Sequence, residues 1–306
     1  MRQFVNQNYK NRPTKKGYKK RAEKFCRFVK DSGYTANQVR KTPKETIQQY
    51  ADSLSESGLS ADTIHTYISL PCAFFDINMA EINKPFRSAS RITKSRGIGN
   101  NQGKRERTQE KYSRLTEFQR RVGIRRTELK KLTGKNLVTD ESGCMCVEVT
   151  RGKGGKYQLQ RVLPQDIEFV SGYFDGSDNL VFTSREMKNK IDLHSMRSAQ
   201  ARRAYDYYAD ICRTKEGTDR LKQQMIDRFT AYNIKYLNAP PARKNRLLAA
   251  FEKEISGVYK LRKDTRQLAQ EKNRPVVYNR TAVMAVSVFH LSHWRCDVTV
   301  SNYLLA

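Results

Sequence analysis

The sequence predicts a mainly α-helical protein of two domains, with a small β-sheet or hairpin in the second domain. Three observations lead to this class. The length of 306 residues suits two domains of ordinary size. Apolar residues recur at three- and four-residue spacing, the helical period, through most of the chain. The two-residue period of strands occurs mainly near the middle of the chain.

The first domain, residues 1–88, is predicted to contain three helices. The first helix starts near Lys15, and the third spans residues 60–76. The second helix begins after Thr42, because Thr42 and Glu45 form a capping-box pattern and a proline occupies the first helical position. The inward-facing residues of the first and third helices are expected to be Ala22, Phe25, Cys26, Val29, Ile64, Tyr67 and Ile68.

Residues 89–111 are predicted to form a basic interdomain linker. Between residues 91 and 111 there are seven Lys or Arg residues, two acidic residues and few apolar ones. Such a composition does not support a packed core, and its charge suits a segment that lies along a phosphate backbone. A linker that is merely solvated is the alternative interpretation.

The second domain, residues 112–306, is predicted to be helical around a small sheet. Residues 144–150 and 157–163 alternate as strands. The glycines between them match a hairpin turn, since glycine adopts the positive φ that tight turns need. A further short strand is expected at 180–183. Helices are expected at about 113–121, 127–132, 193–210 and 282–289, and residues 211–275 are predicted to be a helical insertion.

The net charge is strongly positive, because 59 Lys and Arg against 31 Asp and Glu give +28. This charge predicts a polyanionic partner, and nucleic acid is favoured over a membrane because no basic amphipathic helix stands out. No apolar run approaches the roughly 20 residues of a transmembrane helix, and the N-terminus lacks the apolar stretch of a secretory signal. The six cysteines have neither disulfide-framework nor zinc-site spacing. We therefore expect a cytoplasmic protein with reduced thiols.

Residues suited to phosphodiester chemistry occur in order along the second domain. Arg125 precedes a short helix, where a guanidinium can bind two phosphate oxygens, and Glu128 can hold that guanidinium in place. Lys153 lies in the glycine-rich turn, from which an ammonium can reach into a groove. His194 and Arg197 share one helical face, because they are three residues apart.

The last two candidates are His293, which follows the apolar helix, and Tyr303, which is expected on a short final helix. A metal site is the alternative interpretation for His290, His293 and Cys296, which lie at three-residue steps. No fourth ligand is evident, and a metal for phosphoryl chemistry favours carboxylate ligands. We therefore expect neither a metal nor another cofactor.

This order of an arginine, a turn lysine, His-x-x-Arg, a histidine and a C-terminal tyrosine resembles the tyrosine recombinase family. The matching segments are GIRRTELKKL (123–132), RGKGGKYQLQRVLP (151–164), LHSMR (193–197) and HLSHWRCDVTVSNYLL (290–305). The resemblance implies a two-domain C-shaped clamp on DNA, in which a helical core-binding domain precedes the catalytic domain. It also implies that the catalytic residues are Arg125, Lys153, His194, Arg197, His293 and Tyr303.

The resemblance implies cleavage of DNA through a 3′-phosphotyrosine made by Tyr303. The two arginines are expected to neutralise the charge of the five-coordinate phosphorus. Lys153 is expected to protonate the departing 5′ oxygen, and His194 to accept or orient a proton near the tyrosine. His293 is expected to bind a non-bridging oxygen.

The implied activity is site-specific recombination, the integration or excision of a mobile element. The implied partners are double-stranded DNA with specific recombination sites, a dimer on each site, a homotetramer that exchanges strands through a Holliday junction, and accessory DNA-bending proteins. No membrane partner is expected, and the implied location is the bacterial nucleoid. We further predict that residues 211–275 contact a neighbouring protomer or DNA.

Two alternatives remain open. A type IB topoisomerase uses the same chemistry to relax supercoils without exchanging partners. A basic DNA- or RNA-binding protein without catalysis would use the arginines to bind phosphate and would pack Tyr303 as an ordinary C-terminal residue. Replacing Tyr303 by phenylalanine separates enzyme from binding protein, because only an enzyme would lose covalent adducts.

Overall fold

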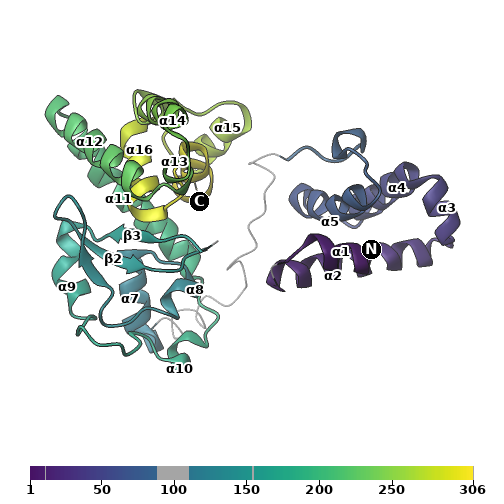
Figure 1. The fold of residues 1–306 in the computed structure, drawn as a ribbon, viewed down its shortest axis with the longest axis horizontal. Helices are drawn as coiled ribbons and strands as arrows, with labels where there is room; N and C mark the ends of the chain where they lie inside the picture. The colour runs from purple at the N-terminus through teal and green to yellow at the C-terminus, as the bar shows by residue number, and fades with distance from the viewer. Residues whose placement is uncertain (11, 88–109, 154, 306) are drawn as a thin grey trace. The chain divides into compact units, whose positions relative to one another are not determined.

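The fold is mainly helical with small antiparallel sheets, as predicted (Figure 1). The computed structural model describes residues 1–10, 12–87, 110–153 and 155–305. The chain divides into two compact units, Met1–Lys94 and Ser95–Ala306. This division falls within the predicted linker 89–111, of which only residues 110 and 111 belong to the described part.

The N-terminal unit is built from helices. Its elements are α1 (Arg2–Asn8), α2 (Arg12–Asp31), α3 (Ala36–Lys41), α4 (Pro43–Glu56), α5 (Ala61–Phe74) and the 3₁₀ turn η1 (Met79–Glu81). The three predicted helices correspond to α2, α4 and α5, and their core includes Phe25, Ile47, Tyr50, Ile64 and Ile68. Cys26, which was predicted to face inward, is exposed. It follows the buried Phe25, and successive helical side chains point about 100° apart, so that in α2 Cys26 is turned toward solvent.

The predicted capping box at Thr42 is wrong. The Thr42 side chain makes no capping hydrogen bond to α4. Its hydroxyl instead donates to the Gln38 carbonyl oxygen at 3.2 Å, because Thr42 also ends the preceding helix α3. A capping box does form one helix earlier, between Thr35 and Gln38 at the start of α3.

The C-terminal unit combines helices with two small sheets. Up to the predicted insertion its elements are α7 (Ser113–Val122), α8 (Arg126–Leu129), β1 (Leu137–Thr139), β2 (Met145–Val149), β3 (Gln158–Arg161), η3 (Pro164–Asp166), α9 (Ile167–Ser171), α10 (Ser184–Met187) and α11 (Leu193–Ile211). The remaining elements are α12 (Lys215–Tyr232), α13 (Ile234–Leu237), α14 (Pro241–Glu254), β4 (Val258–Lys260), α15 (Lys263–Glu271), β5 (Val277–Asn279), α16 (Arg280–Val286), η4 (Ser287–Leu291), α17 (Cys296–Thr299) and η5 (Val300–Leu304).

The larger sheet is antiparallel, with the order β1-β2-β3. The two predicted strands correspond to β2 and β3, which pair from Cys146 opposite Arg161 to Val149 opposite Gln158. The predicted strand at 180–183 is wrong, because only an isolated bridge joins Leu180 to residue 133 before α10 begins. Strand β1 and the pair β4–β5 were not predicted, since three-residue strands carry almost no periodic signal.

Residues 211–275, predicted as an insertion, contribute to the core of the C-terminal unit. Helix α12 packs against α16 (Figure 1). Side chains from α12, from α14 and from the residue after α14 enter the same apolar core as α11 and α16, namely Leu221, Met225, Phe229, Phe251 and Ile255. Removing this segment would therefore expose the core on which α11 and α16 rest. Contact of the segment with DNA or a second protomer stays a prediction.

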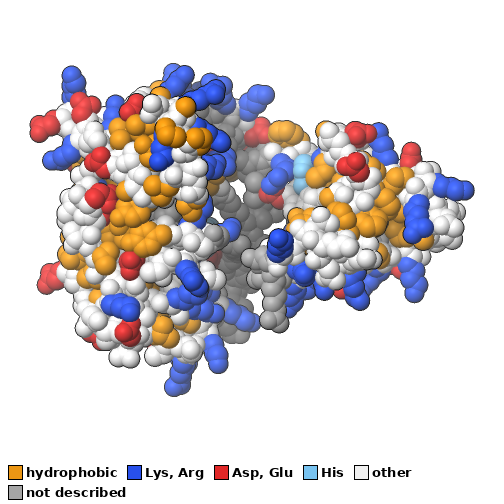
Figure 2. All heavy atoms as spheres, viewed as in Figure 1, with side chains coloured by type: hydrophobic (Ala, Val, Ile, Leu, Met, Phe, Trp, Pro, Cys, Tyr) orange, Lys and Arg blue, Asp and Glu red, His pale blue; other side chains and the backbone are white. Residues whose placement is uncertain are grey.

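The surface is strongly basic. Figure 2 shows Lys and Arg side chains more often than Asp and Glu on the visible face of each unit, in keeping with the net charge of +28. In the part of the chain that the structure describes, no helix has both the length and the apolar character needed to cross a bilayer.

Candidate functional site

Arg125 is held by a buried carboxylate at the start of α8. Helix α7 ends at Gly123, whose φ of +70° reverses the chain and places Arg125 before α8. The Glu128 Oε1 accepts from Arg125 Nη1 at 2.8 Å, and its Oε2 accepts from the Arg125 backbone nitrogen at 3.1 Å. Glu128 is buried, with 3% exposed. The predicted pairing of Glu128 with Arg125 is therefore confirmed.

Arg197 reaches the same place from α11 and is almost completely buried. Its Nη1 donates to the Gly123 carbonyl oxygen, and its Nη2 donates to the Leu291 carbonyl oxygen at 3.2 Å. The Nη2 of Arg125 donates to the same Leu291 oxygen at 3.4 Å. Burial and the neighbouring charge of Arg125 lower the pKa of Arg197. Two guanidiniums thus meet at one carbonyl with a single carboxylate between them, which leaves the site one positive charge in excess.

An irregular backbone makes the Leu291 carbonyl available. Residues 287–291 form a π-helical turn, η4, at the end of the buried helix α16. Ser292 and Trp294 then adopt positive φ values of 54° and 59° on either side of His293. Residues other than glycine rarely adopt this conformation, and π-turns and such strained residues are concentrated at functional sites.

His293 and Tyr303 form a hydrogen-bonded pair. The His293 Nε2 lies 3.0 Å from the Tyr303 hydroxyl oxygen, and Tyr303 is 5% exposed on the second π-turn, η5. Burial lowers the pKa of His293 to about 3, and the positive charges of Arg125 and Arg197 act in the same direction. His293 is therefore neutral near pH 7, and one ring nitrogen of a neutral imidazole can accept a hydrogen bond from the tyrosine hydroxyl.

Two more contacts surround Tyr303. The His194 ring centroid lies 5.5 Å from that of Tyr303, and the Arg197 Cζ lies 5.7 Å from the tyrosine ring. Arg202 on α11 donates to the Tyr303 carbonyl oxygen at 3.2 Å, and this bond ties the terminal turn to the helix that carries His194 and Arg197. The structure thus brings Arg125, His194, Arg197, His293 and Tyr303 together, although 178 residue positions separate the first from the last (303 − 125).

Lys153 is attached to this group through its backbone. Its amide nitrogen donates to Glu128 Oε1 at 3.2 Å, so the carboxylate that holds Arg125 also holds the turn between β2 and β3. The exposed ammonium makes no hydrogen bond to the other five candidates within the described residues. Its charge, like that of Lys156 in the same turn, still lowers the pKa of His293. An incoming phosphate would therefore meet two turn lysines as well as two arginines.

Some functional features could not be read from the sequence. The Leu291 carbonyl is a backbone atom and has no residue signature. Lys156 could have been noticed as a second lysine in the same glycine-rich turn.

His290, considered with His293 and Cys296 as a metal ligand, instead contacts Gln200 Nε2 and the Tyr208 hydroxyl with its two ring nitrogens. Among the residues whose placement is described, no three His, Cys, Asp or Glu side chains form a group that could hold a metal.

The arrangement can bind a tetrahedral anion beside a buried hydroxyl that has a proton acceptor. Two guanidiniums and the turn lysines supply positive charge, and the His293–Tyr303 pair places a hydroxyl beside a ring nitrogen. No protein-family model matches this chain, nor does any curated protein or solved structure. The function must therefore be inferred from the geometry of these residues.

Proposed function

We propose that this protein is a tyrosine recombinase that cuts and rejoins DNA through a phosphotyrosine at Tyr303. The observation that carries the proposal is the hydrogen bond of 3.0 Å between His293 Nε2 and the Tyr303 hydroxyl, beside the guanidiniums of Arg125 and Arg197. These groups come from separate segments of the unit. An arginine that merely packs would not need to share a carbonyl with a second arginine.

The proposed reaction starts with in-line attack of the Tyr303 oxygen on a DNA phosphorus. A bond forms between this oxygen and phosphorus, and the bond from phosphorus to the 5′ oxygen breaks. The tyrosine proton passes to His293, and the departing 5′ oxygen takes a proton from Lys153. The arginines Arg125 and Arg197 stabilise the charge of the five-coordinate phosphorus. The phosphotyrosine conserves the energy of the broken linkage, so that rejoining needs no ATP.

The proposal revises one role that the sequence suggested. His194 was expected to serve as the proton acceptor and His293 to bind a non-bridging oxygen. The Tyr303 hydroxyl is hydrogen-bonded to His293 Nε2, whereas the His194 ring lies beside the tyrosine ring. We therefore assign proton acceptance to His293 and orientation of the ring to His194.

The proposed substrate is double-stranded DNA that carries specific recombination sites. The net charge of +28 supports a polyanionic partner, with affinity that falls as salt rises. The family resemblance adds a dimer on each site and a tetramer that exchanges strands through a Holliday junction. It also adds accessory DNA-bending proteins and a place in the bacterial nucleoid. These partners rest on the resemblance alone.

The test is covalent trapping on nicked suicide duplexes with randomised half-sites, in EDTA. We expect an adduct that survives SDS with the native chain and with Tyr173→Phe, the matched control. Tyr303→Phe should bind the same DNA but form no adduct. Tight, salt-sensitive binding without any adduct would contradict the proposal and leave a DNA-binding protein.

A second readout uses the duplexes that yield adducts. Strand exchange between two labelled duplexes is expected from a recombinase. Relaxation of a supercoiled plasmid without any exchange would instead point to the topoisomerase alternative.

A further inference from the structure

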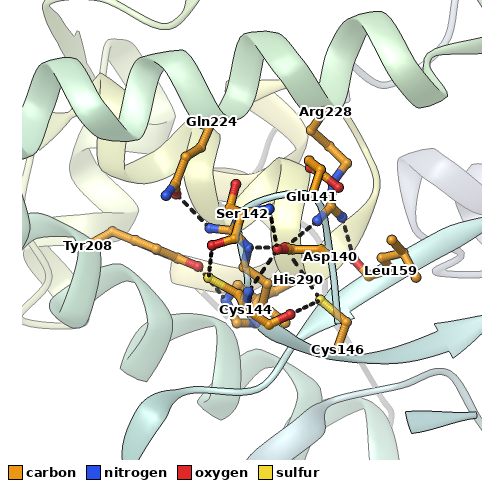
Figure 3. Close-up of polar contacts among 11 residues, drawn as sticks. Asp140, Glu141, Ser142, Cys144, Cys146, Leu159, Tyr208, Gln224, Arg228 and His290 are labelled. Carbon is orange, nitrogen blue, oxygen red and sulfur yellow. Dashed lines mark hydrogen bonds and ion pairs between the residues drawn. The ribbon is translucent and has the colours of Figure 1, made fainter. Parts of the chain in front are cut away.

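A cavity of about 480 Å³ lies in the C-terminal unit, away from the Tyr303 hydroxyl. It is bounded by the turn before β2, by the chain that follows β3, and by α11 and α12. Its volume falls within the range of small-molecule sites, about 300 to 1,000 Å³. Figure 3 shows the polar side of this region, where Gln224 extends from α12 and the Tyr208 hydroxyl meets His290.

The polar groups of the cavity are mainly donors, and two of the basic ones are unsatisfied. Arg161 uses Nε for Asp140 at 2.7 Å and Nη1 for Gln224 at 2.9 Å, but its buried Nη2 has no hydrogen-bond partner. Arg220 lines the cavity and forms no ion pair or hydrogen bond with any residue in the described ranges. No Asp or Glu lines the cavity. An anion would therefore be attracted by Arg220, whereas Asp140 already balances the charge of Arg161, whose Nη2 can still donate a hydrogen bond.

The rest of the wall is apolar. Its aliphatic side chains include Leu163, Ile167, Ile211 and Leu221. Tyr207 and Tyr208 contribute two rings that meet edge to face, with centroids 5.2 Å apart. A bound anion would thus place its charged group at the arginines and an apolar body against these side chains. The complementary ligand is a small amphiphilic anion, a carboxylate or phosphate on a hydrocarbon or aromatic body.

The inner wall of the cavity touches the segment that leads to the candidate catalytic site. The Arg161 Cζ lies 3.6 Å from the Phe289 ring centroid, and the Tyr208 hydroxyl lies 3.1 Å from His290 Nε2. The next residue, Leu291, supplies the carbonyl shared by the two catalytic arginines. Arg161 and Tyr208 touch Phe289 and His290, which immediately precede Leu291. A displacement of either side chain can therefore shift the Leu291 carbonyl through these direct contacts.

We propose that this cavity is a regulatory binding site for a small amphiphilic anion, anchored by Arg161 and Arg220. The ligand head completes the hydrogen bonding of Arg161 Nη2 and neutralises Arg220. The ligand body covers the apolar wall. Binding then alters the segment from Phe289 to Trp294 through Arg161 and Tyr208. The regulatory consequence rests on the proposed function, whereas the binding site does not.

The binding test uses isothermal titration calorimetry with the full chain. The probes are octyl phosphate and octanoate, which differ in head group, together with inorganic phosphate and octanol, which each lack one half of the ligand. We expect at least one amphiphilic anion to bind about tenfold or more tightly than phosphate or octanol, because head and body both contribute. The tighter of the two amphiphiles identifies the head group that the site prefers.

Two charge-reversal variants, Arg220→Glu and its control, locate the binding. Arg161 is not replaced, because Asp140 would lose a partner and the variant would be expected to unfold. The matched control is Arg213→Glu, since Arg213 is exposed and does not line the cavity. We expect Arg220→Glu to weaken binding about tenfold and Arg213→Glu to change it by less than about twofold. Equal weakening by both variants, or no binding of either amphiphile, overturns the site.

Transmission to the catalytic segment is read from Trp294, the only tryptophan in the sequence. We expect its fluorescence to change with the same ligand concentration dependence as the heat of binding. An unchanged emission at saturation would overturn the regulatory part of the proposal. Neither readout uses DNA, so a protein that binds the amphiphile but forms no phosphotyrosine would refute the proposed function and leave the binding site standing.

Discussion

Two clusters of the C-terminal unit use the same kinds of residue for different ends. The proposed catalytic cluster, called the catalytic cluster below, consists of Arg125, Arg197, Glu128, His293 and Tyr303. The buttress cluster consists of Arg161, Arg228, Asp140, Glu141, His290 and Tyr208. Each cluster has two arginines, a histidine and a tyrosine, and both contact the short segment from Phe289 to His293.

The clusters differ in charge balance. In the buttress cluster, Asp140 pairs with both Arg161 and Arg228, and Glu141 accepts from Arg228 Nε at 2.6 Å. Figure 3 shows Arg228 extending from α12 toward Asp140 and Glu141. Two carboxylates thus face two guanidiniums there, whereas the catalytic cluster has Glu128 alone for its two. The balanced cluster holds α12 against the sheet, whereas the unbalanced one keeps one positive charge in excess, as the proposed phosphate binding requires.

The largest effect is expected from Arg228→Met. This change leaves Glu141 without its partner and halves the neutralisation of the buried Asp140. Breaking a buried ion pair in this way costs roughly 3–5 kcal/mol. Urea unfolding should show this loss, and the exposed Arg213→Met should change the free energy of unfolding by less than about 0.5 kcal/mol. A stable Arg228→Met protein would mean that the cluster does not hold α12 in place.

Arg197→Lys should reduce the rate of cleavage more than it reduces stability, the reverse of what is expected for Arg228→Met. A lysine keeps one charge but cannot donate to both Gly123 and Leu291, so the transition state loses an oriented donor. We expect adduct formation on the cleavable duplexes to slow about 100-fold or more. DNA affinity should change little, because lysine keeps the positive charge. The buried carbonyl that loses its donor should lower the free energy of unfolding by about 1–3 kcal/mol, less than the loss expected from Arg228→Met. A cleavage rate within about threefold of the native rate would remove Arg197 from the catalytic cluster.

The histidines make stability sensitive to acid. Burial lowers the pKa of His290 and of His293 to about 3, below the usual value of about 6.5. The unfolded chain therefore binds more protons between these values. Stability is complete above about pH 6.5 and falls toward pH 3, by up to about 1.4 kcal/mol per pH unit for each histidine.

The matched variant for this dependence is His290→Gln, which cannot titrate. Urea unfolding at pH 7, 6 and 5 should give a smaller loss of stability per pH unit for His290→Gln than for the native chain. An identical slope in both proteins would show that His290 does not stay neutral when folded.

The smallest effect is expected from Ser292→Gly, between the two clusters. Ser292 has a φ of +54°, which glycine adopts without strain. The substitution should raise the melting temperature slightly, by an amount that corresponds to about 1 kcal/mol or less. Adduct formation should stay within about twofold of the native rate if strain at this residue serves only to turn the chain. A large loss of cleavage would show that the side chain or the stiffness of Ser292 positions His293.

Local pattern predicted most of the helices but not the short or irregular elements. Residues 193–210, rich in Arg and Tyr, were predicted as the helix that is α11, and the unbroken apolar run 282–289 predicted the buried helix α16. The strands β1, β4 and β5 were missed, since three residues cannot establish a period. The Thr42 capping pattern failed because the same residue also ends α3. Neither π-turn was predicted, because these turns arise where α16 and α17 meet their neighbours.

The sequence by itself determined the basic charge, the helical class, and the order of Arg125, Lys153, His194, Arg197, His293 and Tyr303. The charge and the helical class depend on composition and on residues a few positions apart, and the order of the six residues is read directly along the chain. Tertiary structure alone decided that His293 meets the Tyr303 hydroxyl, that Leu291 serves two arginines, and that α12 belongs to the core. Such contacts join residues that are far apart in the chain or involve backbone atoms. They follow from the packing of α11 on α16, which no local spacing encodes.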